Sequence, residues 1–168
     1  MKLSVFLIML LFVTESYAGE PEIQQVKELF EASASSKVSA NQLLKLLTEV
    51  GPSSSPLLIC YSGAAEMMQA KYVFNPLNKF KRFKKGKKLI EEAVKKDPEN
   101  IEIRFLRFVI QTNLPGFLNY DGHIEQDKSY LMANLKTTGD KKLAKKILDY
   151  LYASKHYPLQ EKKSKNLF

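Results

Sequence analysis

The sequence has no tryptophan and a single cysteine, Cys60, so the chain cannot form an intramolecular disulfide bond. Cys60 lies within an apolar helical pattern, which is typical of a buried structural thiol and not of a nucleophile. The large aromatic residues are ten phenylalanines and eight tyrosines. We therefore expect a core built on phenylalanine and leucine, without covalent cross-links.

Histidine is scarce as well, since only two occur. The sequence patterns of zinc proteases, α/β-hydrolases, phosphate-binding loops and dithiol oxidoreductases are all missing. Asp121, His123, Glu125 and Asp127 could bind a hard metal ion, but alternate residues at a helix start point in different directions. The sequence therefore predicts no metal, no cofactor and no enzymatic activity. An enzyme on a helical scaffold that uses Glu66, His123 or Asp127 is left open as an alternative.

The N-terminus has the pattern of a secretory signal peptide. Lys2 precedes an apolar run over residues 3–13, and Ser16 and Ala18 are small residues at the −3 and −1 positions before Gly19. The run is shorter than an ordinary membrane-spanning helix. We predict a signal peptide over residues 1–18, cleaved near Ala18 and Gly19, and a protein that is periplasmic or secreted. An uncleaved anchor is the alternative.

The chain carries a formal net charge of +8. Such a surplus favours anionic surroundings, for example lipid headgroups or acidic polymers. Export makes nucleic acid a poor candidate, so we expect no nucleic-acid partner.

No stretch alternates with a period of two for long enough to require a strand, so the predicted class is all-α. Residues 97–111 are apolar on two stripes, of which one contains Phe105 and Phe108 and the other contains Ile103 and Leu106. Such a helix needs neighbours on at least two sides. We therefore expect it to be the central helix, with Asp97 as its N-cap.

The remaining apolar patterns complete a domain over residues 19–155, made of antiparallel helical hairpins in a bundle of about seven helices. A polar, lysine-rich tail follows over residues 156–168. The expected helices span residues 21–33, 39–50, 56–73, 76–96, 97–111, 121–138 and 140–154.

One segment resembles a known repeat family. Gly86, Ile90, Ala93 and Pro98 match the small, large apolar, alanine and proline positions of the tetratricopeptide repeat, over about one repeat. The stretches YSGAAEMMQAKYVFNP and IEIRFLRFVIQTNLPGFLNY are also similar to small exported bacterial proteins of unassigned function with helices of this type. The resemblance implies an α-solenoid-like fold and a helical surface that binds proteins or peptides in a groove.

A basic stretch over residues 79–88 interleaves cations with Phe80 and Phe83, as in surfaces that bind anionic membranes. Phe80, Phe83 and Ile90 also share one helical face, so the alternative is a core-facing stripe with a solvated lysine face. The candidate anion-binding residues are Lys79, Lys81, Arg82, Lys84, Lys85, Lys87 and Lys88.

A polar seam on the expected central helix is the candidate for a specific binding site. Arginine on a buried helix needs a partner, and a carboxylate or phosphate would bind its fork with two hydrogen bonds. We expect the seam to face a groove beside the helix over residues 56–73 and to bind an acidic group. An internal carboxylate, from Glu66, Glu91 or Asp127, is the alternative partner. The seam contains Arg104, Arg107, Gln111 and Asn113.

Taken together, these patterns indicate an exported, non-enzymatic binding or scaffold protein that recognises a protein or peptide in the cell envelope. A peripheral binder of anionic lipid or acidic polymer is the alternative that uses the lysine-rich faces.

Overall fold

The computed structural model describes residues 20–154, and within this range it contains seven α-helices, one short 3-10 helix and no strand. The predicted all-α bundle of about seven helices is thereby confirmed. The predicted signal peptide, its cleavage site and the lysine-rich tail lie outside the described residues. The helices are α1 (Ile23–Ser33), α2 (Lys37–Leu46), α3 (Pro56–Lys71), α4 (Pro76–Lys96), α5 (Ile101–Asn113), η1 (Gly116–Leu118), α6 (Ile124–Asn134) and α7 (Lys141–Ala153).

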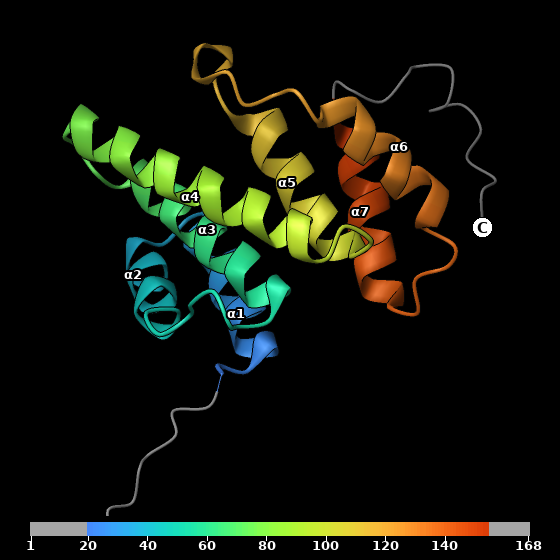
Figure 1. The fold of residues 1–168 in the computed structure, drawn as a ribbon, viewed down its shortest axis with the longest axis horizontal. Helices are drawn as coiled ribbons and strands as arrows, with labels where there is room; N and C mark the ends of the chain where they lie inside the picture. Colours follow the sequence, from blue (N-terminus) through green and yellow to red (C-terminus); the bar gives the residue numbers. More distant parts are fainter. Residues whose placement is uncertain (1–19, 155–168) are drawn as a thin grey trace, which may run out of the picture.

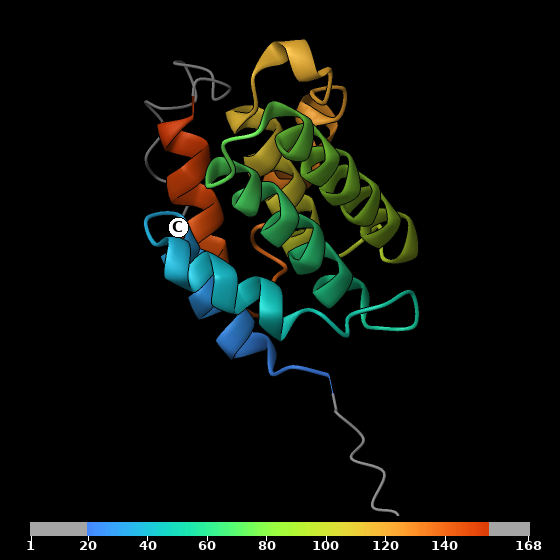
Figure 2. The ribbon, with the colours of Figure 1, turned by 90° about the vertical axis from the view of Figure 1, so that its left-hand side faces the viewer.

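Helices α3 and α4 form an antiparallel hairpin around which the other helices are arranged (Figure 1). Helices α1 and α2 pair with each other and pack against α3, while α5 contacts both helices of the hairpin and pairs with α6. Figure 2 shows the hairpin from its free end, with η1 above it and α2 beside it. No helix between residues 20 and 154 has the length and apolar character to cross a membrane.

Helix α5 lies between two hydrophobic cores, as its two apolar stripes predict. Ile103 and Leu106 belong to the core formed with α1 to α4, and Phe105 and Phe108 belong to the core formed with α6 and α7. Helix α3 is also surrounded, since it contacts α1, α2, α4 and α5. Its middle is buried on every side because its small residues let four helices approach.

The closest approach in the hairpin occurs at two glycines. A Cβ atom added at Gly63 would lie 2.7 Å from the backbone oxygen of Gly86, and one added at Gly86 would lie 2.6 Å from the backbone oxygen of Gly63. Neither steric contact can be relieved by turning a side chain, because both contacted oxygens belong to the backbone. Glycine at both positions therefore sets the distance between α3 and α4.

Polar caps start several helices, although not always at the predicted residue. Asn75 caps α4 and Asp140 caps α7, and the amides of Leu143 and Lys142 hold the pKa of Asp140 below its usual value. Helix α5 is capped by Asn100 and begins at Ile101, so the predicted cap at Asp97 is wrong. A turn between α4 and α5 occupies the residues in between.

Other predicted boundaries also shift. Helix α2 is capped by Ser36, whose side chain accepts a hydrogen bond from the amide of Ser39, so Ser39 lies inside the helix. The same helix ends at Leu46 and not at Val50. Helix α6 is shorter than the predicted helix over residues 121–138, since it spans Ile124–Asn134.

Two aromatic side chains near the start of α4 and on η1 are exposed, so the core-facing stripe that was the alternative for the basic stretch holds only in part. Phe80 on α4 is about half exposed and Phe117 on η1 is largely exposed, whereas Phe83 is buried as predicted. Figure 1 shows that the N-terminal end of α4 projects past α5.

We expect Gly63→Ala to lower the free energy of unfolding by about 1–3 kcal/mol, because the added methyl group overlaps the backbone of Gly86. In an open helix the same change would stabilise the protein by up to about 1 kcal/mol. Urea unfolding followed by circular dichroism measures the difference. Gly139→Ala, which meets no atom within 4 Å, is the matched control. A Gly63→Ala protein as stable as the wild type would contradict the conclusion that Gly63 sets the distance between α3 and α4.

Cys60 is fully buried, as predicted, and burial raises the pKa of its thiol, with a further contribution from the charge of Glu102. We expect Cys60 not to react with an aromatic disulfide reagent in the native protein and to react completely in denaturant. Val38→Cys places a second thiol at an exposed position on α2 and should react in the native state. Rapid reaction of Cys60 in the native wild type would contradict its burial.

Candidate functional site

The polar seam of α5 is occupied by internal ion pairs. The Nε and Nη2 atoms of Arg107 donate to the two carboxylate oxygens of Asp127 at 2.7 and 2.8 Å, and Nη1 donates to Glu91 at 2.8 Å. Arg104 donates to the same Asp127 at 2.8 Å. The side chain of Arg107 is 3% exposed and that of Asp127 is fully buried. All these charges are therefore neutralised inside the protein.

The same network extends to the loop before α6. The hydroxyl of Tyr120 donates to the second oxygen of Glu91 at 2.7 Å. Burial raises the pKa of Tyr120, and the hydrogen bond to Glu91 raises it further. For Arg107, burial lowers the pKa, but the bonds and charges of Asp127 and Glu91 outweigh this effect and raise it. The network joins α4, α5, α6 and the loop.

This arrangement corresponds to the alternative that the sequence left open, in which an internal carboxylate pairs with the arginines. The structure gives Arg107 no accessible donor for an outside acid, because three of its donors already bind Asp127 and Glu91. Gln111 is buried beside them, and Asn113 is exposed and donates to Val109 and Tyr150. The seam therefore holds the fold together and forms no open groove next to α3.

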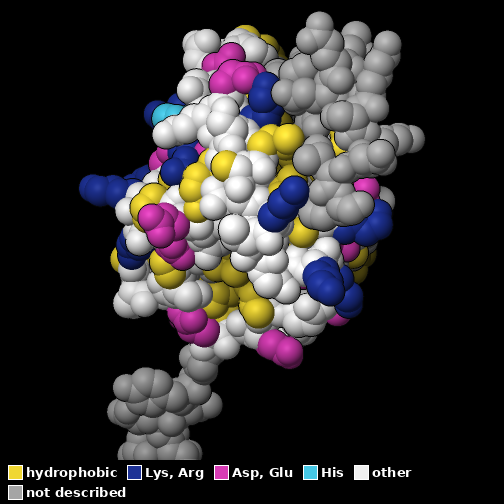
Figure 3. Space-filling model, turned by 90° about the vertical axis from the view of Figure 1, so that its right-hand side faces the viewer, with side chains coloured by type: hydrophobic (Ala, Val, Ile, Leu, Met, Phe, Trp, Pro, Cys, Tyr) yellow, Lys and Arg dark blue, Asp and Glu magenta, His cyan; other side chains and the backbone are white. Residues whose placement is uncertain are grey.

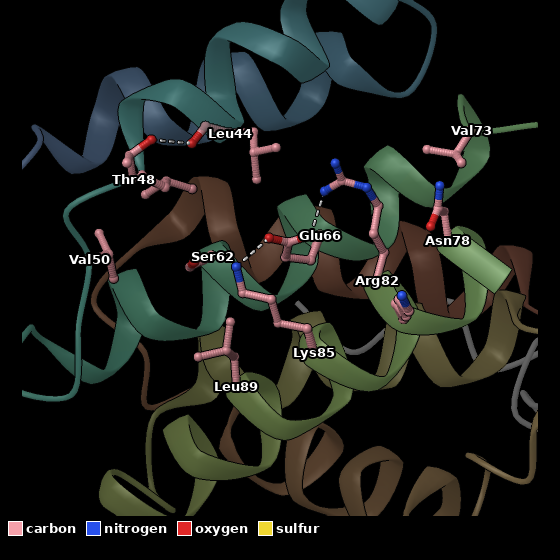
Figure 4. Close-up of a pocket in the computed structure, with 12 residues that line it drawn as sticks. Leu44, Thr48, Val50, Ser62, Glu66, Val73, Asn78, Arg82, Lys85 and Leu89 are labelled. Carbon is pink, nitrogen blue, oxygen red and sulfur yellow. Dashed lines mark hydrogen bonds and ion pairs between the residues drawn. The ribbon is translucent and has the colours of Figure 1, made fainter. Parts of the chain in front are cut away.

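An open groove exists elsewhere, between α2 and the α3–α4 hairpin (Figure 4). Its volume is about 690 Å³. The wall on the side of α2 carries the aliphatic residues Leu44 and Val50, and Leu89 of α4 lines the opposite side. The other lining residues are Leu47, Thr48, Ser62, Glu66, Val73, Asn78, Lys81, Arg82 and Lys85.

Glu66 is the buried charge of this groove. Its carboxylate accepts hydrogen bonds from Arg82 and from Lys85, both at 2.7 Å, and lies between their side chains in Figure 4. The side chain of Glu66 is 5% exposed, whereas that of Lys85 is 64% exposed. Lys81 also lines the groove and forms no ion pair with any residue between 20 and 154. Three cations against one anion leave the groove positively charged.

The basic stretch over residues 79–88 lies in α4, and its side chains point to two different sides of this helix. Lys81, Arg82 and Lys85 line the groove. Lys79 lines a second, apolar pocket on the other side of the hairpin, and Lys84 lies over the ring of Phe80 at 5.6 Å. Lys87 lies over the ring of Tyr120 at 4.8 Å, and Lys88 is exposed.

The residues considered for catalysis or metal binding have separate partners. Glu66 binds the cations of α4, Asp127 binds the arginines of α5, and the ring of His123 lies 3.2 Å from the side-chain oxygen of Gln126. Glu125 pairs with Lys128. In the part of the chain that the structure describes, no three histidine, cysteine, aspartate or glutamate side chains are grouped as metal ligands.

Fold and groove together define an all-α protein of helical hairpins with a positively charged groove on its central hairpin. Comparisons with protein-family models, with curated proteins and with solved structures gave no significant match.

We expect Arg107→Met to lower the free energy of unfolding by about 3–5 kcal/mol, because Asp127 stays buried and loses the two hydrogen bonds from Arg107. Thermal and urea unfolding measure the loss. Lys145→Met removes an exposed pair with Asp149 on α7 and should cost at most about 0.5 kcal/mol. Equal effects of the two substitutions would contradict the structural role of the seam.

Proposed function

We propose that this protein is an exported, non-enzymatic binding or scaffold protein that recognises a peptide segment of a partner protein in the cell envelope. The observation that carries the proposal is the groove between α2 and the α3–α4 hairpin, where a buried glutamate holds two cations beside an aliphatic wall. Export rests on the N-terminal sequence pattern.

The chemistry of the groove favours a particular kind of peptide. Lys81 is unpaired among the described residues, and Arg82 and Lys85 share a single carboxylate, so an acidic side chain or a terminal carboxylate would find positive charge there. Leu44, Leu47 and Val50 offer apolar contact within the same groove. The expected ligand is a peptide with an acidic residue next to aliphatic residues.

Pairing with Glu66 gives Arg82 and Lys85 fixed positions before any ligand arrives. A cation that is already ordered loses less conformational entropy on binding than a free surface lysine. The resemblance of part of α4 to a tetratricopeptide repeat supports the same role, because such helical pairs usually bind peptides in a groove. The enzyme alternative has no comparable support, because Glu66 already accepts hydrogen bonds from both Arg82 and Lys85.

Selection of a displayed library of random peptides on the immobilised protein tests the proposal. We expect enrichment of peptides with an acidic residue beside aliphatic residues. Fluorescence polarisation with the enriched peptides should then show that Lys81→Glu weakens binding by about fivefold or more, since an attraction of up to about 1 kcal/mol becomes a repulsion.

Lys141→Glu on α7 makes the same charge change at an exposed position outside the groove and should leave the affinity unchanged. Two results would refute the proposal: no enrichment of any peptide class, or enriched peptides that bind the Lys81→Glu and Lys141→Glu proteins equally well.

A further inference from the structure

Exposed hydrophobic side chains gather at the free end of the α3–α4 hairpin. Phe74 is 95% exposed, Leu77 73%, Phe80 51% and Phe117 80%. They are four of the five large hydrophobic residues that are exposed between residues 20 and 154, and we call them the apolar tip. Scattered exposed hydrophobic residues need no explanation, but a cluster marks an interaction surface.

Two segments that are distant in the sequence form this tip. Phe74 and Leu77 flank Pro76 at the start of α4, and Phe80 follows one turn later, with its ring 6.2 Å from that of the buried Phe83. Phe117 lies on η1, and it lines the same pocket of about 630 Å³ as Phe80. Figures 1 and 2 show η1 beside the N-terminal half of α4.

The loop is held so that Phe117 stays exposed. Asn119 takes the left-handed conformation, with φ 48°, and ends the short helix. The next residue, Tyr120, is buried, donates to Glu91 and packs its ring 6.2 Å from Phe83. This anchor fixes the base of the loop, while its apex extends beyond the core.

The α4 side of the tip carries one sign of charge. Eight lysines and arginines and no acidic residue lie between Glu66 and Glu91 in the sequence. Lys71 and Lys79 line the apolar pocket together with Phe80 and Phe117, and Lys84 lies over the ring of Phe80. The opposite end of the molecule differs, because basic and acidic side chains are interspersed on the face in Figure 3.

We propose that the apolar tip inserts into the headgroup region of a bilayer that contains anionic phospholipids. Apolar and aromatic side chains surrounded by lysines match such an interface, where the rings enter the acyl boundary and the ammonium groups contact lipid phosphates. A second copy of this chain fits less well, because it would bring the same lysines against these. This inference is independent of the groove and would keep the groove next to the membrane surface.

The absence of tryptophan from the chain makes a direct test available. Phe117→Trp introduces a single tryptophan at the tip, and Val38→Trp introduces one at the exposed position on α2 outside the tip. With vesicles of phosphatidylcholine and phosphatidylglycerol, we expect the emission of the Phe117→Trp protein to shift to the blue and to be quenched by brominated lipid. With phosphatidylcholine alone the effect should be much weaker, and the emission of the Val38→Trp protein should respond to neither kind of vesicle.

Vesicle co-sedimentation of the otherwise unaltered protein measures the energetic contribution. Phe117→Ser should lower the partition coefficient about tenfold, and Lys79→Gln about fivefold. Val38→Ser and Lys141→Gln are the matched controls outside the tip and should leave the partition coefficient unchanged. All variants keep the same N-terminus, so any contribution of the apolar segment over residues 3–13 is common to all of them.

Three outcomes would overturn the inference. The first is an equal response of the Phe117→Trp and Val38→Trp proteins, or no response of the former. The second is a blue shift of the Phe117→Trp protein that rises with protein concentration in the absence of vesicles, which would assign the tip to self-association. The third is a partition coefficient that is the same for the Phe117→Ser protein and the wild type, or one that does not fall when added salt screens the lysines.

Discussion

The close crossing of α3 and α4 is the constraint on which the rest of the structure depends. At Gly63 and Gly86 the two backbones approach to a distance that leaves no room for a Cβ atom. The hairpin therefore behaves as one thin layer with a lined cavity on each side. The groove faces α2 on one side, and the apolar pocket faces the loop after α5 on the other. Both proposed interaction surfaces are thus properties of a single hairpin.

Buried charge connects this hairpin to the other helices. Three acidic side chains are buried among residues 20–154, and each is paired with a basic or hydroxyl group from another helix. Glu66 pairs with Arg82 and Lys85, Asp127 with Arg104 and Arg107, and Glu102 with Lys27 and Tyr61. A buried charge without a partner is costly, so each pair specifies which helices must be neighbours. Pairing of this kind turns the α5 seam into a structural element.

The two proposed surfaces differ in how they use the same basic stretch. Arg82 and Lys85 of α4 face the groove and are ordered by Glu66, which suits recognition of one acidic group at a defined position. On the other side, Lys79 lines the apolar pocket with Phe80 and Phe117, and Lys84 lies over the ring of Phe80. Such an arrangement suits a fluid surface with many negative charges. One helix can therefore serve a specific contact and a membrane contact at once.

The sequence by itself determined the class, the helix count and most helix positions, because apolar periodicity, prolines and caps are local signals. It also determined that Cys60 is buried and that α5 has two apolar faces. The predicted start of α5 was wrong, because a turn after α4 moves the N-cap from Asp97 to Asn100. The choice between an external and an internal partner for Arg107 could not be predicted, because it depends on how α6 packs against α5.

Only the tertiary structure decided that Glu66, Arg82 and Lys85 meet in a groove and that Phe80 and Phe117 share an exposed tip. The physical reason is that periodicity reports which face of a helix is apolar, whereas the groove and the tip arise from which helices leave those faces uncovered.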